Sequence, residues 1–188
     1  MKKKITFILN GQSISLDVAP HEVLLEVLRD RLGVRSPKCG CDRGDCGTCT
    51  VLLDGRSVRS CLVLAIEADG QTITTLEGLM TEGKITPLQQ SLLERNAFQC
   101  GFCAPGMILS ATELLRRNPR PDEHQIREAI AGNLCRCTGY TPIVDAVREY
   151  ADARQQTTPV APSPAGRGND PTPNPSPLRR GGRSGRRK

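Results

Sequence analysis

Two patterns of apolar residues mark the start of the chain. The segments KITFILN and SISLDV, within residues 4–18, alternate apolar and polar residues with a period of two. They flank Asn10 and Gly11, a pair that favours the tight turn of a β-hairpin. Residues 22–32 then change to a helical period, with apolar side chains along one face. The chain therefore begins with a predicted hairpin followed by a predicted helix.

Strand patterns return after residue 48. The run CTVLLDGRSVRSCLVLAI predicts two strands around a turn at Asp54 and Gly55, and residues 71–75 predict a short last strand. Residues 38–48, which precede these strands, are so rich in glycine and cysteine that we expect no regular structure there. These patterns predict an α+β domain over residues 1–76.

From about residue 77 the apolar positions keep a helical period. Pro105 and Pro121 stand where a first helical turn tolerates proline, because the missing N–H has no partner there. The pattern predicts an all-helical domain over residues 77–153, with helices at 87–97, 105–117, 122–131 and 142–153.

The last part of the chain, 154–188, is predicted to be a disordered, basic tail rich in Pro and Arg. Residues 157–188 hold six Arg and one Lys against one Asp, which accounts for the whole formal net charge of +6. Such a composition buries too little apolar surface to offset the entropy of ordering. The tail also lacks aromatic side chains on which bases stack, so we expect a solvated extension rather than a nucleic-acid-binding arm.

The compartment follows from the N-terminus and the cysteines. No apolar run approaches the roughly 20 residues of a membrane-spanning helix. The apolar part of MKKKITFILNGQ is shorter than the about 7–15 residues of a secretory signal core. We therefore expect a cytoplasmic protein, where thiols stay reduced and clustered cysteines are more often metal ligands than disulfides.

Eight of the nine cysteines form two sets. The first cysteine set has the spacing C-x4-C-x2-C followed by a distant fourth cysteine, which is typical of plant-type 2Fe–2S ferredoxins. Glycines are interleaved with these cysteines, and glycine lets a loop direct its N–H groups at cluster sulfurs. Zinc sites more often pair C-x2-C with C-x2-C, so iron is favoured. The members of this set are Cys41, Cys46, Cys49 and Cys61.

The second cysteine set combines C-x2-C with C-x-C. Cys100 and Cys103 precede a predicted helix, and Cys135 and Cys137 follow one, so helix ends could bring four thiolates together. On spacing alone this set favours iron but leaves zinc open. Cys39 is the remaining cysteine; as a ligand in place of Cys41 it would break the ferredoxin spacing, so we interpret it as a bystander thiol.

Three stretches together resemble one family. GCDRGDCGTCTVLLDG, QCGFCAPGMI and GNLCRCTGY are similar to the signature stretches of the small iron–sulfur subunit of molybdenum hydroxylases. That family includes xanthine dehydrogenases, aldehyde oxidoreductases and aerobic carbon monoxide dehydrogenases. The resemblance covers about residues 3–153 and excludes the tail. It implies a plant-ferredoxin-like β-grasp domain followed by a four-helix-bundle domain, each with one 2Fe–2S cluster.

The resemblance also implies ligands and partners. It assigns Cys41, Cys46, Cys49 and Cys61 to the β-grasp cluster, and Cys100, Cys103, Cys135 and Cys137 to the helical-domain cluster. The helical-domain cluster would face the molybdenum–pterin cofactor of a large subunit, and the other would face FAD in a medium subunit of a heterotrimer. Gln99 matches a position near the pterin, where its amide could bind the cofactor or simply be exposed.

The predicted function is therefore electron relay from molybdenum through two clusters toward FAD. His21 and His124 stand alone in polar surroundings, and no glycine-rich loop suits a nucleotide, so we expect no catalytic residue in this chain. A free-standing ferredoxin would leave the second cysteine set unused. A zinc-stapled interaction module remains the other alternative. The substrate, whether a purine, an aldehyde, a heterocycle or carbon monoxide, would be selected by the large subunit.

Overall fold

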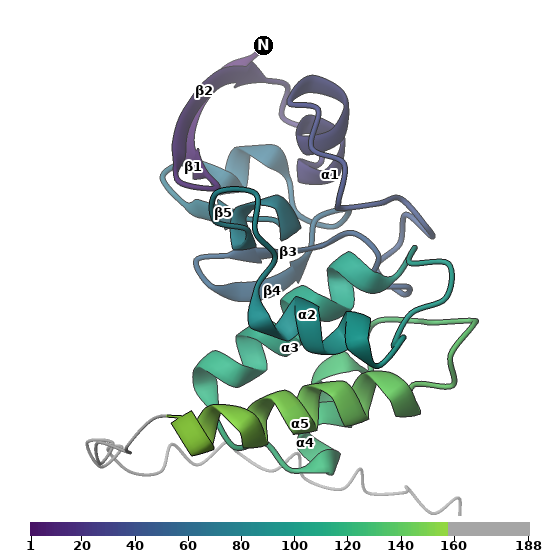
Figure 1. The fold of residues 1–188 in the computed structure, drawn as a ribbon. Helices are drawn as coiled ribbons and strands as arrows, with labels where there is room; N and C mark the ends of the chain where they lie inside the picture. The colour runs from purple at the N-terminus through teal and green to yellow at the C-terminus, as the bar shows by residue number, and fades with distance from the viewer. Residues whose placement is uncertain (158–188) are drawn as a thin grey trace, which may run out of the picture.

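The computed structural model describes residues 1–157, which form a sheet-containing part and a helical part (Figure 1). In Figure 1 the sheet lies in the upper half with α1, and the helices α2 to α5 lie below it. The fold is thus α+β, as the patterns predict. The elements, in chain order, are β1 (Lys3–Leu9), β2 (Gln12–Val18), α1 (Leu24–Glu26), η1 (Val27–Arg31), β3 (Thr50–Leu53), β4 (Arg56–Arg59), η2 (Ala65–Ala68), β5 (Thr72–Thr74), η3 (Leu76–Leu79), α2 (Pro87–Glu94), α3 (Ala104–Arg117), α4 (Glu123–Ile130) and α5 (Thr141–Thr157).

The sheet has five strands in the order β2-β1-β5-β3-β4. The predicted hairpin is confirmed, because β1 and β2 pair antiparallel with Leu9 opposite Gln12. Asn10 and Gly11 both have positive φ angles, the conformation that the tight turn requires. β1 pairs parallel with β5, so the first strand lies against the last one. One face of the sheet packs with α1 and η1 around Phe7, Leu24 and Leu28, which are almost completely buried.

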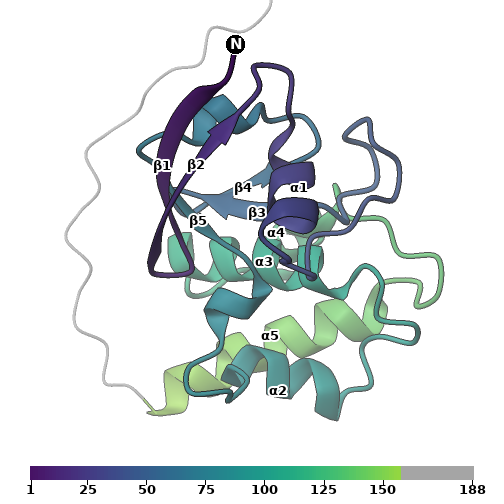
Figure 2. The ribbon, with the colours of Figure 1, turned by 90° about the horizontal axis from the view of Figure 1, so that it is seen from above.

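The helical part has its own hydrophobic cluster. Side chains of α2, α3, α4 and α5 share it, including Leu92, Met107, Ile126 and Val147. α3 also packs against β3 and β4, and Figure 2 shows it between the sheet and the pair α2 and α5. No helix among the described residues is long and apolar enough to cross a membrane.

The structure differs from the predicted elements at three places. Both strands predicted around Asp54 and Gly55 are present as β3 and β4, but β4 ends at Arg59, and the run SCLVLAI continues outside the strand as Cys61 approaches Cys49. The helix predicted at 22–32 begins at Leu24, and its second half is π-helical. α5 continues to Thr157, beyond the boundary at 153 where the tail was predicted to begin. The rest of the predicted tail lies outside the described residues.

Glu77 joins the segment before the cysteine loop to the end of the sheet. Its carboxylate accepts hydrogen bonds from the backbone N–H of Ser36 (2.9 Å) and Arg35 (3.1 Å), and from the hydroxyls of Ser36 and Thr75. Burial alone would raise the pKa of Glu77, but the hydrogen bonds from Ser36 and Thr75 outweigh it and hold the pKa below its ordinary value. The ionised carboxylate is therefore the form that stabilises the fold.

Replacing this carboxylate by an amide tests its contribution. We expect Glu77→Gln to lower the free energy of unfolding at neutral pH by about 1–3 kcal/mol, because buried donors lose a charged acceptor. The folded-state pKa lies below the unfolded one, so the wild-type advantage is complete above the unfolded pKa. It disappears as pH falls through the folded pKa, where wild type and variant converge. Urea unfolding followed by circular dichroism at neutral and acidic pH measures both effects.

The matched control for Glu77 is Glu82→Gln, which changes an exposed glutamate in a turn. We expect it to change the free energy of unfolding by less than about 0.5 kcal/mol. Equal losses in the two variants, or a Glu77 effect that persists at acidic pH, would contradict the assignment.

Candidate metal centres

The first cysteine set gathers around the loop of residues 38–49 and the turn after β4. Cys49 lies immediately before β3 and Cys61 shortly after β4, so the β-hairpin brings two distant cysteines together. Both are buried, and their sulfurs lie 3.4 Å apart. Ser60 stabilises the turn after β4, because its hydroxyl donates a hydrogen bond of 2.7 Å to the carbonyl oxygen of Cys49. Cys41 and Cys46 are half-buried in the loop itself.

Backbone N–H groups in this loop point at sulfur. The N–H of Cys46 donates to the Cys41 sulfur at 3.3 Å. Hydrogen bonds from the backbone of Arg43 and Cys46 lower the pKa of Cys41 to about 7. In contrast, burial and the neighbouring Cys49 raise the pKa of Cys61 to about 12. The loop thus stabilises the thiolate form of Cys41, whereas the buried thiol of Cys61 needs a nearby cation to lose its proton.

Glycines allow the loop to close tightly. A Cβ at Gly40 would lie 2.9 Å from the Cys46 sulfur, and a Cβ at Gly44 would overlap Leu62 Cδ1. Gly44 and Gly47 also have positive φ angles, which side chains rarely adopt. Glycine is therefore required here for both space and conformation, as the interleaved spacing suggested.

The second cysteine set lies at the ends of helices in the lower part of the molecule. Cys103 is the residue before α3, and Cys135 and Cys137 lie between α4 and α5. The sulfurs of Cys100 and Cys137 are 3.7 Å apart, and both residues are exposed. Cys103 is buried, and burial together with a hydrogen bond to Cys135 raises the pKa of Cys103 to about 12.

Hydrogen bonds hold the segment between α4 and α5 in place around Cys135. The Thr138 hydroxyl donates to the Cys135 sulfur at 3.2 Å, and the N–H of Cys135 donates to the Tyr140 hydroxyl at 2.8 Å. Burial would raise the pKa of Cys135, but hydrogen bonds from Thr138 and from the backbone of Cys137 outweigh it and lower the pKa. This set also surrounds its sulfurs with donors.

The donor sets suit a cluster with two irons. Two thiolates on one tetrahedral metal, at about 2.3 Å each, lie about 3.8 Å apart. The pairs Cys49–Cys61 at 3.4 Å and Cys100–Cys137 at 3.7 Å approach this separation. Within residues 1–157 no group of three or more His, Cys, Asp or Glu side chains gathers around a single-ion position. Thiolates in pairs, with backbone N–H groups directed at sulfur, therefore fit the 2Fe–2S group.

The other predicted residues lie around these sets. The Gln99 amide donates to the Cys137 carbonyl oxygen at 3.1 Å, so this exposed side chain is held on the second set. Cys39 is exposed, but its thiol is partly shielded from water, and this shielding together with the nearby Asp42 raises the pKa of the thiol. His21 is exposed, and His124 lies on the surface of α4 within 3.6 Å of Glu128.

A buried seam that the sequence patterns did not predict joins the two cysteine sets. Asn133 is 1% exposed, and its amide donates to the Gly47 carbonyl oxygen (2.9 Å) and to Thr50 Oγ1 (3.2 Å). Its Oδ1 accepts a hydrogen bond of 2.9 Å from Ser110 of α3. We call these contacts the seam; it consists of Gly47, Thr50, Ser110, Gly132 and Asn133.

Close backbone packing accompanies the seam. A Cβ at Gly47 would overlap the Gly132 carbonyl oxygen, so only glycine fits there. Beside it, the N–H of Leu134 donates to the Cys46 carbonyl oxygen at 2.9 Å. Cys46 belongs to the first set, and Leu134 directly precedes Cys135 of the second. This backbone hydrogen bond thus adds to the contacts of the seam by linking a member of the first set to the neighbour of a member of the second.

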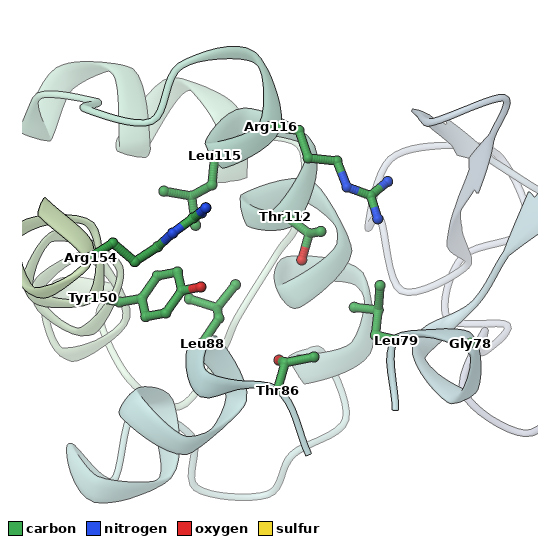
Figure 3. Close-up of a pocket in the computed structure, with 9 residues that line it drawn as sticks. All are labelled: Gly78, Leu79, Thr86, Leu88, Thr112, Leu115, Arg116, Tyr150 and Arg154. Atoms are coloured by element: carbon green, nitrogen blue, oxygen red, sulfur yellow. The ribbon is translucent and has the colours of Figure 1, made fainter. Parts of the chain in front are cut away.

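A surface pocket lies away from both cysteine sets. It has a volume of about 350 Å³ and is lined by residues of α2, α3, α5 and the segment before α2. Figure 3 shows Arg154 beside the ring of Tyr150, at 5.8 Å from the ring centroid, with Leu115 next to it. No cysteine lines this pocket, so it is separate from the candidate metal centres.

Known proteins share both halves of this arrangement. Residues 7–79 match the 2Fe-2S iron-sulfur cluster binding domain family, and residues 75–148 match the 2Fe-2S binding domain family. The small FeS subunit of nicotinate dehydrogenase from Eubacterium barkeri is 50% identical over 153 residues, which cover 81% of this chain and 97% of that protein. A probable xanthine dehydrogenase subunit from Bacillus subtilis is 41% identical over 143 residues, which cover 76% of this chain and 82% of that protein.

A solved structure extends the similarity to the fold. A chain of quinoline 2-oxidoreductase from Pseudomonas putida 86 matches with a TM-score of 0.78 and 42% identity, over 82% of this chain and 97% of that chain. Two cluster-binding domains in one chain define a two-cluster iron–sulfur protein, a class that carries electrons. The chain belongs to the family of small iron–sulfur subunits of molybdenum hydroxylases and is the electron-transfer subunit of an oxidoreductase complex.

The seam allows a direct test of how the two parts are held together. We expect Asn133→Ala to lower the free energy of unfolding by at least about 2 kcal/mol, because the Gly47 carbonyl and the Ser110 hydroxyl lose buried partners. Urea unfolding followed by circular dichroism measures the loss.

Asn118→Ala is the control for Asn133, since the Asn118 amide bonds to Gln125 on the surface. We expect this variant to lose less than about 1 kcal/mol. Similar losses for both variants would mean that the seam adds nothing beyond an ordinary surface hydrogen bond.

Proposed function

We propose that the first cysteine set ligates one 2Fe–2S cluster and the second cysteine set ligates another. The observation that carries this assignment is the pairing of sulfurs within each set, at 3.4 Å for Cys49 and Cys61 and at 3.7 Å for Cys100 and Cys137. Each bound cluster would supply a site that gains and loses one electron. The chain's own residues supply thiolates, N–H donors and a fixed spacing between the two sites.

The direction of transfer is the second part of the proposal. Cys100 and Cys137 are exposed, so the second set reaches the surface where a large molybdenum-cofactor subunit can approach. Gln99 lies on the same surface through its bond to Cys137, and its amide would bind the pterin cofactor. Electrons would then pass to the first set and on to FAD in a medium subunit. Relatives whose names describe them as small subunits support a complex of this kind.

We further propose how the chain is divided. Residues 1–76 would form a β-grasp domain and residues 77–153 a four-helix-bundle domain, each with one cluster, and residues 154–188 a tail. The separate hydrophobic clusters of the sheet and of the helices support this division. We also propose that the protein is cytoplasmic, because thiols stay reduced in that compartment and clustered cysteines are there more often metal ligands than disulfides.

The metal content distinguishes this function from its alternatives. We expect about four iron and about four labile sulfide per chain, two of each for every cluster, and two distinguishable rhombic EPR signals after reduction. Metal analysis and EPR of the dithionite-reduced protein measure both. Zinc in place of iron would support an interaction module, and a single signal would support a simple ferredoxin.

A ligand variant tests the assignment of the second set. We expect Cys137→Ser to weaken or abolish one EPR signal, leave the other present and slow flavin reduction by substrate in the purified complex. Cys39→Ser is the matched control, because this exposed thiol is not assigned as a ligand, and we expect both signals to remain. Loss of a signal in Cys39→Ser, or of both signals in Cys137→Ser, would contradict the assignment.

A further inference from the structure

Lys38 extends from the first cysteine loop to the second cysteine set. Its main chain is fixed to the first loop by two hydrogen bonds with Thr48. The Lys38 N–H donates to the Thr48 carbonyl oxygen at 2.9 Å, and the Thr48 hydroxyl donates to the Lys38 carbonyl oxygen at 2.9 Å. Thr48 itself lies between Cys46 and Cys49, so the base of Lys38 is positioned by the first set.

The other end of the side chain reaches Phe102. The Lys38 ammonium lies 5.4 Å from the centroid of the Phe102 ring and donates to the Phe102 carbonyl oxygen at 3.4 Å. Both contacts suit a cation, since the ring face and the carbonyl carry partial negative charge. Phe102 lies between Cys100 and Cys103, so the ammonium is held beside the second set.

The ring is also held from the side of the first loop. A Cβ at Gly40 would lie 3.6 Å from Phe102 Cε1, so the ring packs against the first loop near this glycine. Phe102 is 45% exposed, so the remaining part of the ring is covered by its neighbours. The contact therefore fixes where the charge of Lys38 lies.

Lys38 is surrounded by groups from both parts of the molecule. Burial and the neighbouring Arg29 lower the pKa of Lys38, while Cys103, Glu77 and Cys100, in their ionised forms, act in the opposite direction. Cys103 and Cys100 belong to the second set, although Lys38 precedes the first set in sequence. The electrostatic coupling of Lys38 therefore runs across the boundary between the two parts of the molecule.

We propose that Lys38 raises the reduction potential of the cluster held by the second cysteine set, an inference that rests on the proposed two-cluster function. Reduction adds one electron and one negative charge, and no bond forms or breaks. A fixed positive charge nearby stabilises the reduced form, and this effect falls with distance. Lys38 thus sets the difference in reduction potential between the two clusters. It acts through its positive charge and does not ligate either cluster.

The test is a redox titration of the purified complex, with dithionite as the electron source and EPR as the readout. Removing the charge with Lys38→Gln should disfavour reduction by roughly tenfold, which equals about 59 mV for one electron. The shift should affect only the signal that Cys137→Ser weakens or removes. Phe102→Leu removes the ring beneath the ammonium and should shift the same signal by a smaller amount in the same direction.

Two controls separate charge from structure. Lys38→Arg keeps the charge and stacks on an aromatic ring, so its potential should match wild type. Lys4→Gln removes one positive charge from an exposed strand position distant from both cysteine sets and should leave both potentials unchanged.

Three results would overturn the inference. These are unchanged potentials in Lys38→Gln, equal shifts of both signals, or an equal shift in Lys38→Arg and Lys38→Gln. Absence of two signals from the wild-type complex would instead refute the two-cluster function itself, so the two failures are distinguishable.

Discussion

The buried amide of Asn133 is the constraint on which the arrangement of the two cysteine sets depends. It satisfies the Gly47 carbonyl on the sheet side and the Ser110 hydroxyl on the helical side at once. A polar group buried this deeply is costly unless every partner is present, so the two halves fit in one relative position. Electron transfer between two sites needs a fixed separation, and the contacts of the seam hold the two parts of the molecule at one separation.

Local patterns predicted most of the fold, and long-range contacts account for what they missed. Periods of two and of 3.6 residues predicted the hairpin and helices, because these depend on neighbours in sequence. β4 is shorter than the apolar pattern suggested, because the chain leaves the strand after Arg59 to bring Cys61 to Cys49. Spacing likewise indicated the two cysteine sets, because their members occur in closely spaced groups along the chain. It could not predict that Asn133 reaches Gly47, 86 positions away, or that Lys38 reaches Phe102.

The cysteines differ in their surroundings in a way that spacing does not reveal. Cys61 and Cys103 are buried and hold their protons firmly, whereas backbone N–H groups favour the thiolate of Cys41. Metal binding must displace the protons of the buried thiols, so the affinity of each set depends on pH. Each set also combines buried and more accessible cysteines, which gives it an inner side fixed by packing and an outer side open to a neighbour.

The seam also bears on how the chain is made. Translation proceeds from the N-terminus, and domains generally fold as units while synthesis continues. The last cysteine of the first set is Cys61, yet the amide that closes over Gly47 belongs to Asn133, which is synthesised much later. During this interval the loop of residues 38–49 lacks its cover from the helical part. On the proposed assignment, the first site would remain open to cluster insertion until the helical part docks on it.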